Sequence, residues 1–445
     1  MADILLVDFG TSRVKCVLWS PESQAVLDEA QVASPAPRFG PAGEVEISAE
    51  AYWCALETTA GKLANRHPLV KALWLCSELH GVIAATPAGE PITPYIGWRD
   101  ARASAKNALG VSTFDRLNDR NETFFALSGM RLRPGLPILS LAFLSAHNHL
   151  PQAFRLFTLP DWLLWRGGER DPAVHASVAA GTGLYDINRR QWSQQLYELA
   201  GLADRCIVTS RIVAAGELAG RIHLGERELQ VFGCFGDLQS AVAGAGFPER
   251  AKLVVNLGTG SQVLRSADNV PSGIERRPAA GGGEIAAITH IPSGRAINGF
   301  AQLLDGSARL GGGAAFFWQK FAELSTADVL GARLDVDLNV FDASWQYQHG
   351  GSIRGIHEGS FSPMDLMAAI AKSWLAQYAL AMDRLDPARE DDVFLVSGGL
   401  SRRAAFIAPV IAALSGRQAR LARIVTGEET LDGLLSMSRV HARKD

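Results

Sequence analysis

Two pairs of short apolar runs have the same pattern at distant points of the chain. The first pair is 4–9 and 14–19, and the second pair is 253–257 and 262–264. In both pairs the connecting segment begins with Gly-Thr. Short apolar runs joined by a glycine-containing turn are typical of antiparallel strands in a hairpin. The repetition predicts two related domains, each opening with the same hairpin.

Other segments have the signals of a third strand and of helices. Residues 394–396 form an apolar run that ends in a glycine pair, and Ser401 after it could cap a helix through Leu414. Ser362, followed by proline and by Asp365, has the pattern of a capped helix start. Apolar residues follow it at four-residue spacing: Leu366, Ile370, Trp374 and Tyr378. Strands that alternate with amphipathic helices predict an α/β fold.

The length and the small residues near the middle of the chain predict where the domains divide. A single core usually stops growing at about 250–300 residues, so a chain of 445 residues should form at least two domains. We place the junction at Gly244–Gly246, which gives expected domains at 1–244 and 245–445. The glycine runs 281–283 and 311–313 predict loops.

The composition narrows the class of protein. A hydrophobic content of 47% and a charged content of 20% are typical of a folded globular chain. The formal charge of -3 provides no basic surface for nucleic acid or for an anionic membrane. The 5 cysteines form no C-x-x-C pair, which fits neither a disulfide framework nor a zinc site. Because the N-terminus has no basic segment before its apolar run, we expect a soluble cytoplasmic protein.

The two Gly-Thr turns could bind phosphate groups. Glycines in a turn expose successive backbone N–H groups to an anion, and a neighbouring carboxylate can orient Mg²⁺. Asp8 and the turn at 10–12 offer both features, and 258–261 offers a second such turn. For either turn alone, an ordinary hairpin connection is the simpler interpretation. The chain has neither a P-loop motif nor a dinucleotide-binding G-x-G-x-x-G, which argues against both of those protein classes.

Asp237 and a cluster of polar residues near position 90 could act on a polyol. Asp237 follows a strand-like segment, where it could accept a proton from an attacking hydroxyl or cap the next helix. The cluster combines an imidazole, an indole, a carboxylate and a guanidinium, which together can hold a sugar: His80, Trp98, Asp100 and Arg102. Alternatively, Trp98 could belong to the core, and Asp100 could form a surface ion pair with Arg102.

The order and spacing of these segments resemble the FGGY carbohydrate kinases, in the superfamily that includes actin and the heat-shock chaperone ATPases. The resemblance runs nearly end to end. It is carried by a first phosphate motif at 8–15, the W-R-D-A-R sugar motif at 98–102, a catalytic segment at 235–237, a second phosphate motif at 256–261 and an adenosine motif at 397–402. Gly43, Glu46 and Trp53, and the segments 176–186 and 192–193, are similar to further family motifs.

The resemblance implies a fold, an activity and a set of site residues. The fold would be α/β, with two ribonuclease-H-like (actin-like ATPase) domains and a ligand cleft between them. The activity would be that of an ATP-dependent sugar kinase in which Asp237 is the catalytic base and Asp8 and Asp237 hold Mg²⁺. The residues expected at the nucleotide are Gly10, Thr11, Ser12, Lys15, Gly258, Thr259, Gly398 and Gly399. Those expected at the sugar are His80, Trp98, Asp100, Arg102, Asp237 and Gln239, with Arg102 bracing Asp100.

The identity of the sugar follows less directly from the resemblance. Glycerol-specific relatives carry an R-E pair where this chain has Leu79-His80, whereas relatives that phosphorylate xylulose and heptuloses carry Q-x-H-G. The segment 78–81 resembles the second pattern, with Glu78 in place of glutamine, and therefore favours a ketose such as xylulose. The chain also lacks the usual lysine after Pro137, is short between 313 and 350, and lacks the alanine-rich end of the family.

The alternative is an actin-like sensor that binds nucleotide and sugar without significant kinase activity. Asp237 distinguishes the two hypotheses, because a pure binder does not need a base beside a sugar. A small-molecule sugar is the expected partner, and a homodimer is left open.

Overall fold

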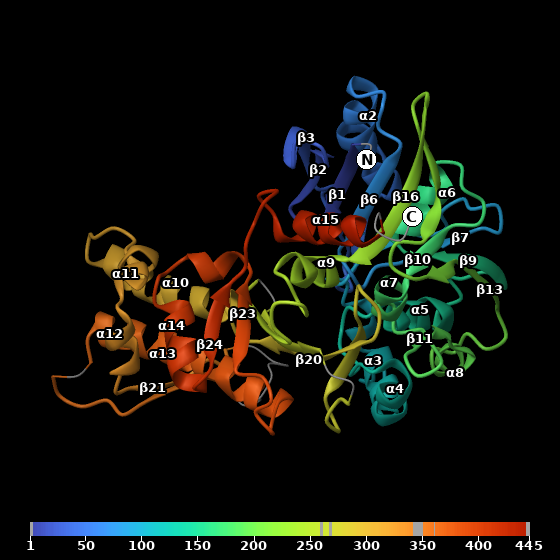
Figure 1. Ribbon diagram of the computed structural model, residues 1–445. Helices are drawn as coiled ribbons and strands as arrows, with labels where there is room; N and C mark the ends of the chain where they lie inside the picture. Colours follow the sequence, from blue (N-terminus) through green and yellow to red (C-terminus); the bar gives the residue numbers. More distant parts are fainter. Residues whose placement is uncertain (1–2, 259–260, 267–268, 341–349, 360, 442–445) are drawn as a thin grey trace. The chain divides into compact units, whose positions relative to one another are not determined.

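The computed structural model describes residues 3–258, 261–266, 269–340, 350–359 and 361–441 (Figure 1). The chain forms two compact units. The first contains Met1–Gly244, Glu275–Glu284 and Ile424–Asp445, and the second contains Ala245–Ile274 and Ile285–Arg423. One boundary between the units lies where the sequence placed it, after Gly244. The expected continuous second domain, 245–445, is not found. The segments Glu275–Glu284 and Ile424–Asp445 belong to the first unit.

The first unit is built on a mixed sheet with the strand order β15-β16-β6-β1-β2-β3. The strands are β1 (Ile4–Phe9), β2 (Arg13–Ser20), β3 (Ala25–Ala33), β6 (Ala72–Ser77), β15 (Leu218–Leu224) and β16 (Arg227–Gly236). β1, β2 and β3 form an antiparallel meander, while β6 runs parallel to both β1 and β16. The predicted N-terminal hairpin is therefore confirmed.

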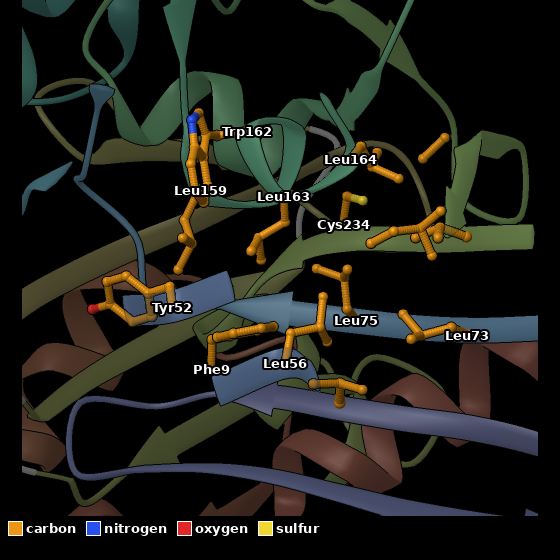
Figure 2. Close-up of a cluster of buried hydrophobic side chains, with 14 of the residues drawn as sticks. Phe9, Tyr52, Leu56, Leu73, Leu75, Leu159, Trp162, Leu163, Leu164 and Cys234 are labelled. Carbon is orange, nitrogen blue, oxygen red and sulfur yellow. The ribbon is translucent and has the colours of Figure 1, made fainter. Parts of the chain in front are cut away.

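Apolar side chains cover both faces of this sheet. On one face, Phe9, Leu73 and Leu75 belong to a cluster with side chains of α6 (Leu159–Arg166) and α1 (Ala49–Leu56), and Figure 2 labels several of its members. On the other face, Leu6 and Trp74 pack against α15 (Glu429–His441). Successive side chains of a strand point to opposite faces. Asp8 therefore shares the α15 face with Leu6.

The second unit contains five consecutive strands of a six-stranded sheet, in the order β20-β18-β17-β23-β24. Its strands are β17 (Leu253–Asn256), β18 (Ser261–Ser266), β20 (Glu284–Ile291), β23 (Val393–Ser397) and β24 (Gln418–Leu421). β17, β18 and β20 form an antiparallel meander, and β23 runs parallel to β17. The strand order and directions repeat those of β1, β2, β3, β6 and β16 in the first unit. Each unit therefore has the same sheet topology, as the two similar hairpins predicted.

Two helices of the second unit test the predicted helix starts. α13 (Pro363–Leu385) begins with a capping box formed by Ser362 and Asp365, as predicted. The predicted helix from Ser401 to Leu414 is wrong at its start, because Ser401 lies in a 3₁₀ turn and α14 spans Ile407–Ser415. Gly398 has a φ of 89°, and a Cβ there would lie 2.6 Å from the backbone of Leu257. The backbone at Gly398 passes close to Leu257, and the helix begins only at Ile407.

Most of the remaining elements are short. In the first unit they are β4 (Arg38–Phe39), β5 (Val45–Ile47), α2 (Lys62–Arg66), β7 (Ile83–Ala85), β8 (Tyr95–Ile96), α3 (Thr113–Asn118), α4 (Asn121–Ser128), α5 (Pro137–Ala146), β9 (Ala153–Phe157), β10 (Ala173–His175), α7 (Ala176–Gly181), β11 (Tyr185–Asp186), β12 (Gln191–Trp192), α8 (Gln194–Leu199), β13 (Cys206–Thr209), β14 (Arg211–Val213), α9 (Asp237–Gly244) and β19 (Glu275–Pro278). In the second they are α10 (Gly294–Leu310), α11 (Phe317–Glu323), α12 (Thr326–Leu330), β21 (Asp335–Asp337) and β22 (Ser352–Arg354). Among the described residues, every helix is too short or too polar to span a bilayer.

Candidate active site

Three parallel strands of the first unit bring acidic residues to one edge of the sheet. In the strand register, Phe9 of β1 and Gly236 of β16 both pair with Ser77, the last residue of β6. Asp8, Glu78 and Asp237 lie at or next to these three strand ends. Ligand sites in α/β proteins commonly form at the carboxyl ends of parallel strands. The three carboxyl groups therefore mark this edge as the candidate active site.

Asp237 is the first residue of α9, directly after β16. The pairing of β16 with β6 shifts register between Gly233 and Phe235, which is a β-bulge of the kind often found beside active sites. The Asp237 Oδ1 atom accepts a hydrogen bond of 2.8 Å from the backbone N–H of Leu238, the next residue in the first turn of α9. Burial, and then the charge of Asp8, raise the pKa of Asp237 to about 7. A carboxyl group with this pKa can exchange a proton near neutral pH.

Asp8 is held by two hydrogen-bond donors. The hydroxyl of Thr430 donates to Oδ2 at 2.7 Å, and the thiol of Cys76 donates to Oδ1 at 3.4 Å. Burial raises the pKa of Asp8, and the bond from Thr430 is the largest effect that opposes this rise. Thr430 has no signal in the sequence, because it lies 422 positions from Asp8 and outside every recognised motif.

The C-terminal helix brings Thr430 to this edge. α15 packs along α9 and against β1 and β6, and Figure 1 shows it beside α9. The hydroxyl of Ser240 in α9 donates to the backbone oxygen of Thr430 at 2.7 Å. This bond fixes the start of α15 beside the start of α9.

The turn between β1 and β2, which was predicted to bind phosphate, is closed by two hydrogen bonds. The N–H of Gly10 donates to the oxygen of Arg13 at 3.1 Å and closes the turn, while the hydroxyl of Ser34 donates to the oxygen of Gly10 at 2.6 Å. Thr11 and Ser12 are exposed at its tip. The Lys15 ammonium group lies 3.8 Å from the carboxylate of Glu428, beside the same turn.

His80 has an unusual backbone conformation and is uncharged. Its φ of 65° lies in the left-handed region, which costs a non-glycine residue on the order of 1–3 kcal/mol. The ring Nδ1 lies 2.7 Å from the oxygen of Gly181, so Nδ1 carries the proton and Nε2 is left as an acceptor. Burial, followed by the charges of Arg133 and Arg277, lowers the pKa of His80 to about 3. A neutral imidazole of this kind can accept a hydrogen bond from a sugar hydroxyl.

Trp98 is not a core residue, because 42% of it is exposed. Its ring N–H donates to Glu78 Oε2 at 3.2 Å, and the hydroxyl of Tyr52 donates to Glu78 Oε1 at 3.1 Å. Glu78, the residue that departs from the family pattern, therefore fixes the orientation of the indole. Burial raises the pKa of Glu78.

Asp100 and Arg102 form a buried ion pair and not the surface pair considered from the sequence. The side chain of Asp100 is 0% exposed and that of Arg102 is 4% exposed. The Asp100 carboxylate accepts bonds from the Arg102 guanidinium at 2.9 Å and from the N–H of Val45 at 2.8 Å, and Arg102 also reaches Glu46 at 2.9 Å. Arg102 thus braces Asp100 as expected. Both residues therefore have a structural role near Trp98. The Asp100 carboxylate is buried and is not accessible to a ligand.

Gln239 is 1% exposed, and its amide N–H donates to the oxygen of Pro278 at 3.2 Å. This bond joins α9 to the segment Glu275–Glu284. The structure therefore shows Gln239 as a bridge between two parts of the first unit.

The predicted nucleotide residues of the second unit lie at the ends of neighbouring strands. Gly258 follows β17, and Gly398 and Gly399 follow β23, which is parallel to β17. The Asn256 amide donates to the Ser397 hydroxyl at 3.0 Å and ties the two strand ends together. Thr259 lies outside the described residues.

The acidic edge of the first unit fits Mg²⁺ by the chemistry of its groups. Mg²⁺ prefers oxygen ligands and is commonly bound by one or two carboxylates together with substrate phosphates. The charge of Asp8 contributes to the raised pKa of Asp237, which places the two carboxyl groups near each other. Within the described ranges, no group of three or more His, Cys, Asp or Glu side chains forms a metal site. A cation here would therefore depend on oxygen atoms from the nucleotide and from water.

Comparison with known proteins gives one consistent family. Residues 4–244 match the model described as "FGGY family of carbohydrate kinases, N-terminal domain". The chain is 24% identical over 267 residues to a xylulose kinase of Klebsiella pneumoniae, covering 57% of this chain and 52% of that protein. It is 26% identical over 321 residues to an apulose kinase of Pectobacterium atrosepticum, covering 65% of this chain and 62% of that protein.

The fold also matches solved structures over its full length. The crystal structure of a ligand-bound xylulose kinase from Lactobacillus acidophilus superposes with a TM-score of 0.81 at 15% identity, covering 100% of this chain and 90% of that chain. The expected α/β fold, with two sheet-rich domains of the actin-like ATPase type, is therefore confirmed.

Proposed function

The chain belongs to the FGGY family of carbohydrate kinases, and from this premise we propose that it transfers the γ-phosphoryl group of MgATP to a hydroxyl of a small sugar. The observation that carries the proposal is Asp237, whose carboxyl group has its pKa raised to about 7 beside the carboxyl of Asp8. The sugar proposed is a ketose such as xylulose, because the segment 78–81 resembles the pattern of ketose-phosphorylating relatives.

Asp237 acts as the general base in the proposed reaction. Its carboxylate accepts the proton of the attacking hydroxyl as the new bond to phosphorus forms, a contribution typically worth about 10²–10⁴-fold in rate. The second oxygen of the group can do this while Oδ1 keeps its bond to the N–H of Leu238. The hydrogen bond to Leu238 and the catalytic role of Asp237 are therefore compatible.

Asp8 and Asp237 would hold Mg²⁺, which supplies charge neutralisation for the phosphate groups. Gly10, Thr11, Ser12 and Lys15 are proposed to contact the phosphates. Lys15 would exchange its contact with Glu428 for a phosphate oxygen. In the second unit, Gly258, Thr259, Gly398 and Gly399 are proposed to contact the nucleotide.

His80 and Trp98 are proposed to bind the sugar. The Nε2 atom of His80 accepts a hydroxyl hydrogen bond, and the exposed indole of Trp98 offers a flat surface for the carbon chain. Asp100, Arg102 and Gln239 were expected at the sugar, and the proposal now gives them the supporting roles that their buried contacts indicate.

The alternative function is nucleotide and sugar binding without phosphoryl transfer. Replacing Asp237 by asparagine separates the two hypotheses, because the change keeps the size and the oxygen that accepts from Leu238 but removes the base. A kinase should lose at least about 10²-fold in kcat while ligand-induced thermal shifts remain. The matched control is Asp115→Asn, since Asp115 also lies in the first turn of a helix but serves only a capping box. If Asp237→Asn keeps more than about a tenth of kcat, Asp237 is not the base.

A further inference from the structure

The backbone just before Asp237 has an unusual conformation. β16 shifts its register against β6 between Gly233 and Phe235, and Cys234 within this bulge has a φ of 52°. A left-handed conformation is unfavourable for a non-glycine residue and persists only where surrounding contacts hold it in place. Asp237 follows the bulge directly after Gly236. The contacts that hold the bulge therefore also determine where the proposed base lies.

One of these contacts comes from α7, in the segment 176–186, for which the proposed function gives no role. The backbone N–H of Gly236 donates to the hydroxyl oxygen of Ser177, in the first turn of α7, at 3.0 Å. Ser177 is only 1% exposed, so water does not compete for this hydrogen bond. Ser177 therefore holds the residue that directly precedes Asp237.

His175, the N-cap residue of α7, directs the hydroxyl of Ser177. The backbone N–H of Ser177 donates to Nδ1 of His175 at 3.1 Å, and the Ser177 Oγ atom lies 2.9 Å from the same nitrogen. Because a backbone N–H only donates, Nδ1 is an acceptor, and the hydroxyl also donates to it. Burial lowers the pKa of His175 to about 4, so the ring is neutral near pH 7 and keeps this acceptor. The lone pairs of the Ser177 oxygen are then left for the N–H of Gly236.

α7 also contacts the sugar-binding side of the proposed site. At its last residue, the oxygen of Gly181 accepts the hydrogen bond from Nδ1 of His80 at 2.7 Å. A Cβ added at Gly181 would lie 3.3 Å from Leu79 Cδ2, and one added at Gly236 would lie 2.6 Å from the same atom. The Leu79 side chain is therefore packed closely against both α7 and the end of β16. One short helix thus contacts both the backbone before the proposed base and the proposed sugar ligand.

We propose that Ser177 is a positioning residue for phosphoryl transfer, because its hydroxyl fixes the backbone before Asp237 and so aligns the base with the sugar hydroxyl that is to be phosphorylated. The inference rests on the proposed kinase function and adds a residue that acts through Asp237, not by contact with the sugar or the nucleotide. A general base must lie within about 2.6–3.2 Å of the group whose proton it accepts. A displacement of about 1 Å can reduce the rate by about 10²-fold.

The test compares Ser177→Ala with a matched control, Ser128→Ala, in steady-state kinetics with MgATP, ketoses and polyols. Ser128 is also 1% exposed, and its hydroxyl oxygen also accepts from a backbone N–H, that of Met130 at 3.1 Å. Both substitutions remove one buried hydrogen bond, so both should lower the Tm to a similar extent. Only Ser177→Ala should lower kcat, by about 10- to 100-fold. The KM values for sugar and MgATP should stay within about twofold of wild type in both variants.

A double substitution shows whether Ser177 acts through Asp237. Residues that work as one unit have non-additive effects on the rate. In the Asp237→Asn background the base is already absent, so adding Ser177→Ala should change kcat by less than about twofold. The same substitution should lower kcat by about 10- to 100-fold in the wild-type background. An equal loss of kcat in both backgrounds would show that Ser177 does not act through Asp237, and the inference would be wrong.

The remaining outcomes separate this inference from the proposed function. If the wild type phosphorylates a sugar and Ser177→Ala has the same kcat as Ser128→Ala, the kinase function stands and the inference is wrong. If the wild type phosphorylates no compound, the proposed function fails, and the positioning role fails with it. If Ser177→Ala does not fold, Ser177→Cys takes its place, because the thiol is similar in size and a weaker acceptor. A lower kcat at unchanged KM then supports the inference, and an unchanged kcat contradicts it.

Discussion

The hydrogen bond between Thr430 and Asp8 links the last helix of the chain to the proposed Mg²⁺ site. Thr430→Val removes the hydroxyl and keeps the β-branched shape. A hydrogen bond of 2.7 Å to a buried carboxylate is worth about 1.5–3 kcal/mol, which corresponds to a Tm decrease of roughly 3–9 °C for a unit of this size. Loss of the donor also raises the pKa of Asp8 further, because the Thr430 bond is the largest effect that lowers it.

The sign of the pH dependence follows from the direction of that shift. The folded-state pKa of Asp8 lies above its unfolded value, so the folded state binds more protons in the interval between the two, and stability falls as the pH rises through it. Thr430→Val widens the interval. The Tm difference between the variant and wild type should therefore be larger at pH 8 than at pH 5.

The assay is thermal unfolding at both pH values, together with the Mg²⁺ dependence of kcat. Thr430→Ser keeps the hydroxyl and should resemble wild type, whereas Thr430→Val should need more Mg²⁺ for half-maximal rate. Equal Tm values and equal Mg²⁺ requirements for the two variants at both pH values would show that the hydroxyl does not support Asp8.

Three further substitutions test the neighbouring residues. Trp98→Ala should raise the sugar KM several-fold, which corresponds to a loss of about 0.5–1.5 kcal/mol of binding free energy, and leave the MgATP KM unchanged. An unaltered sugar KM would show that Trp98 does not bind the sugar. Asp100→Asn should lower stability by up to about 3–5 kcal/mol, measured as Tm, because it leaves Arg102 poorly compensated, while kcat of the folded variant stays near wild type; a large loss of kcat at unchanged Tm would return Asp100 to the catalytic site. His80→Gln should reduce the loss of stability on acidification below about pH 6.5, because a pKa lowered to about 3 means that the unfolded state binds more protons there; an identical pH profile would show that His80 is not buried as a neutral group.

The local pattern predicted the elements well where neighbours in sequence determine the structure. The hairpin strands β1, β2, β17 and β18 and the capped start of α13 follow from apolar runs, Gly-Thr turns and a capping box within a few residues. The start of α14 could not be predicted in this way. It depends on the close passage of Gly398 along Leu257, a contact between distant segments.

The same distinction holds at the candidate active site. Asp8 and Asp237 were identifiable because each stands beside a glycine-containing motif at a strand end. Thr430 has no such signal, since it meets Asp8 through a contact across 422 positions. The burial of side chains could not be predicted either. The W-R-D-A-R motif suggested that Asp100 binds a polyol, whereas in the structure its carboxylate accepts hydrogen bonds from Arg102 and Val45.

The measurement that tests the central claim most directly is ³¹P NMR of the protein with MgATP and a panel of ketoses and polyols. The account predicts a new sugar-phosphate resonance that appears as the γ-phosphate resonance of ATP declines. This signal should require both the sugar and the carboxylate of Asp237. Absence of a sugar phosphate across the panel, with sugar and ATP bound or with inorganic phosphate as the only product, would contradict it.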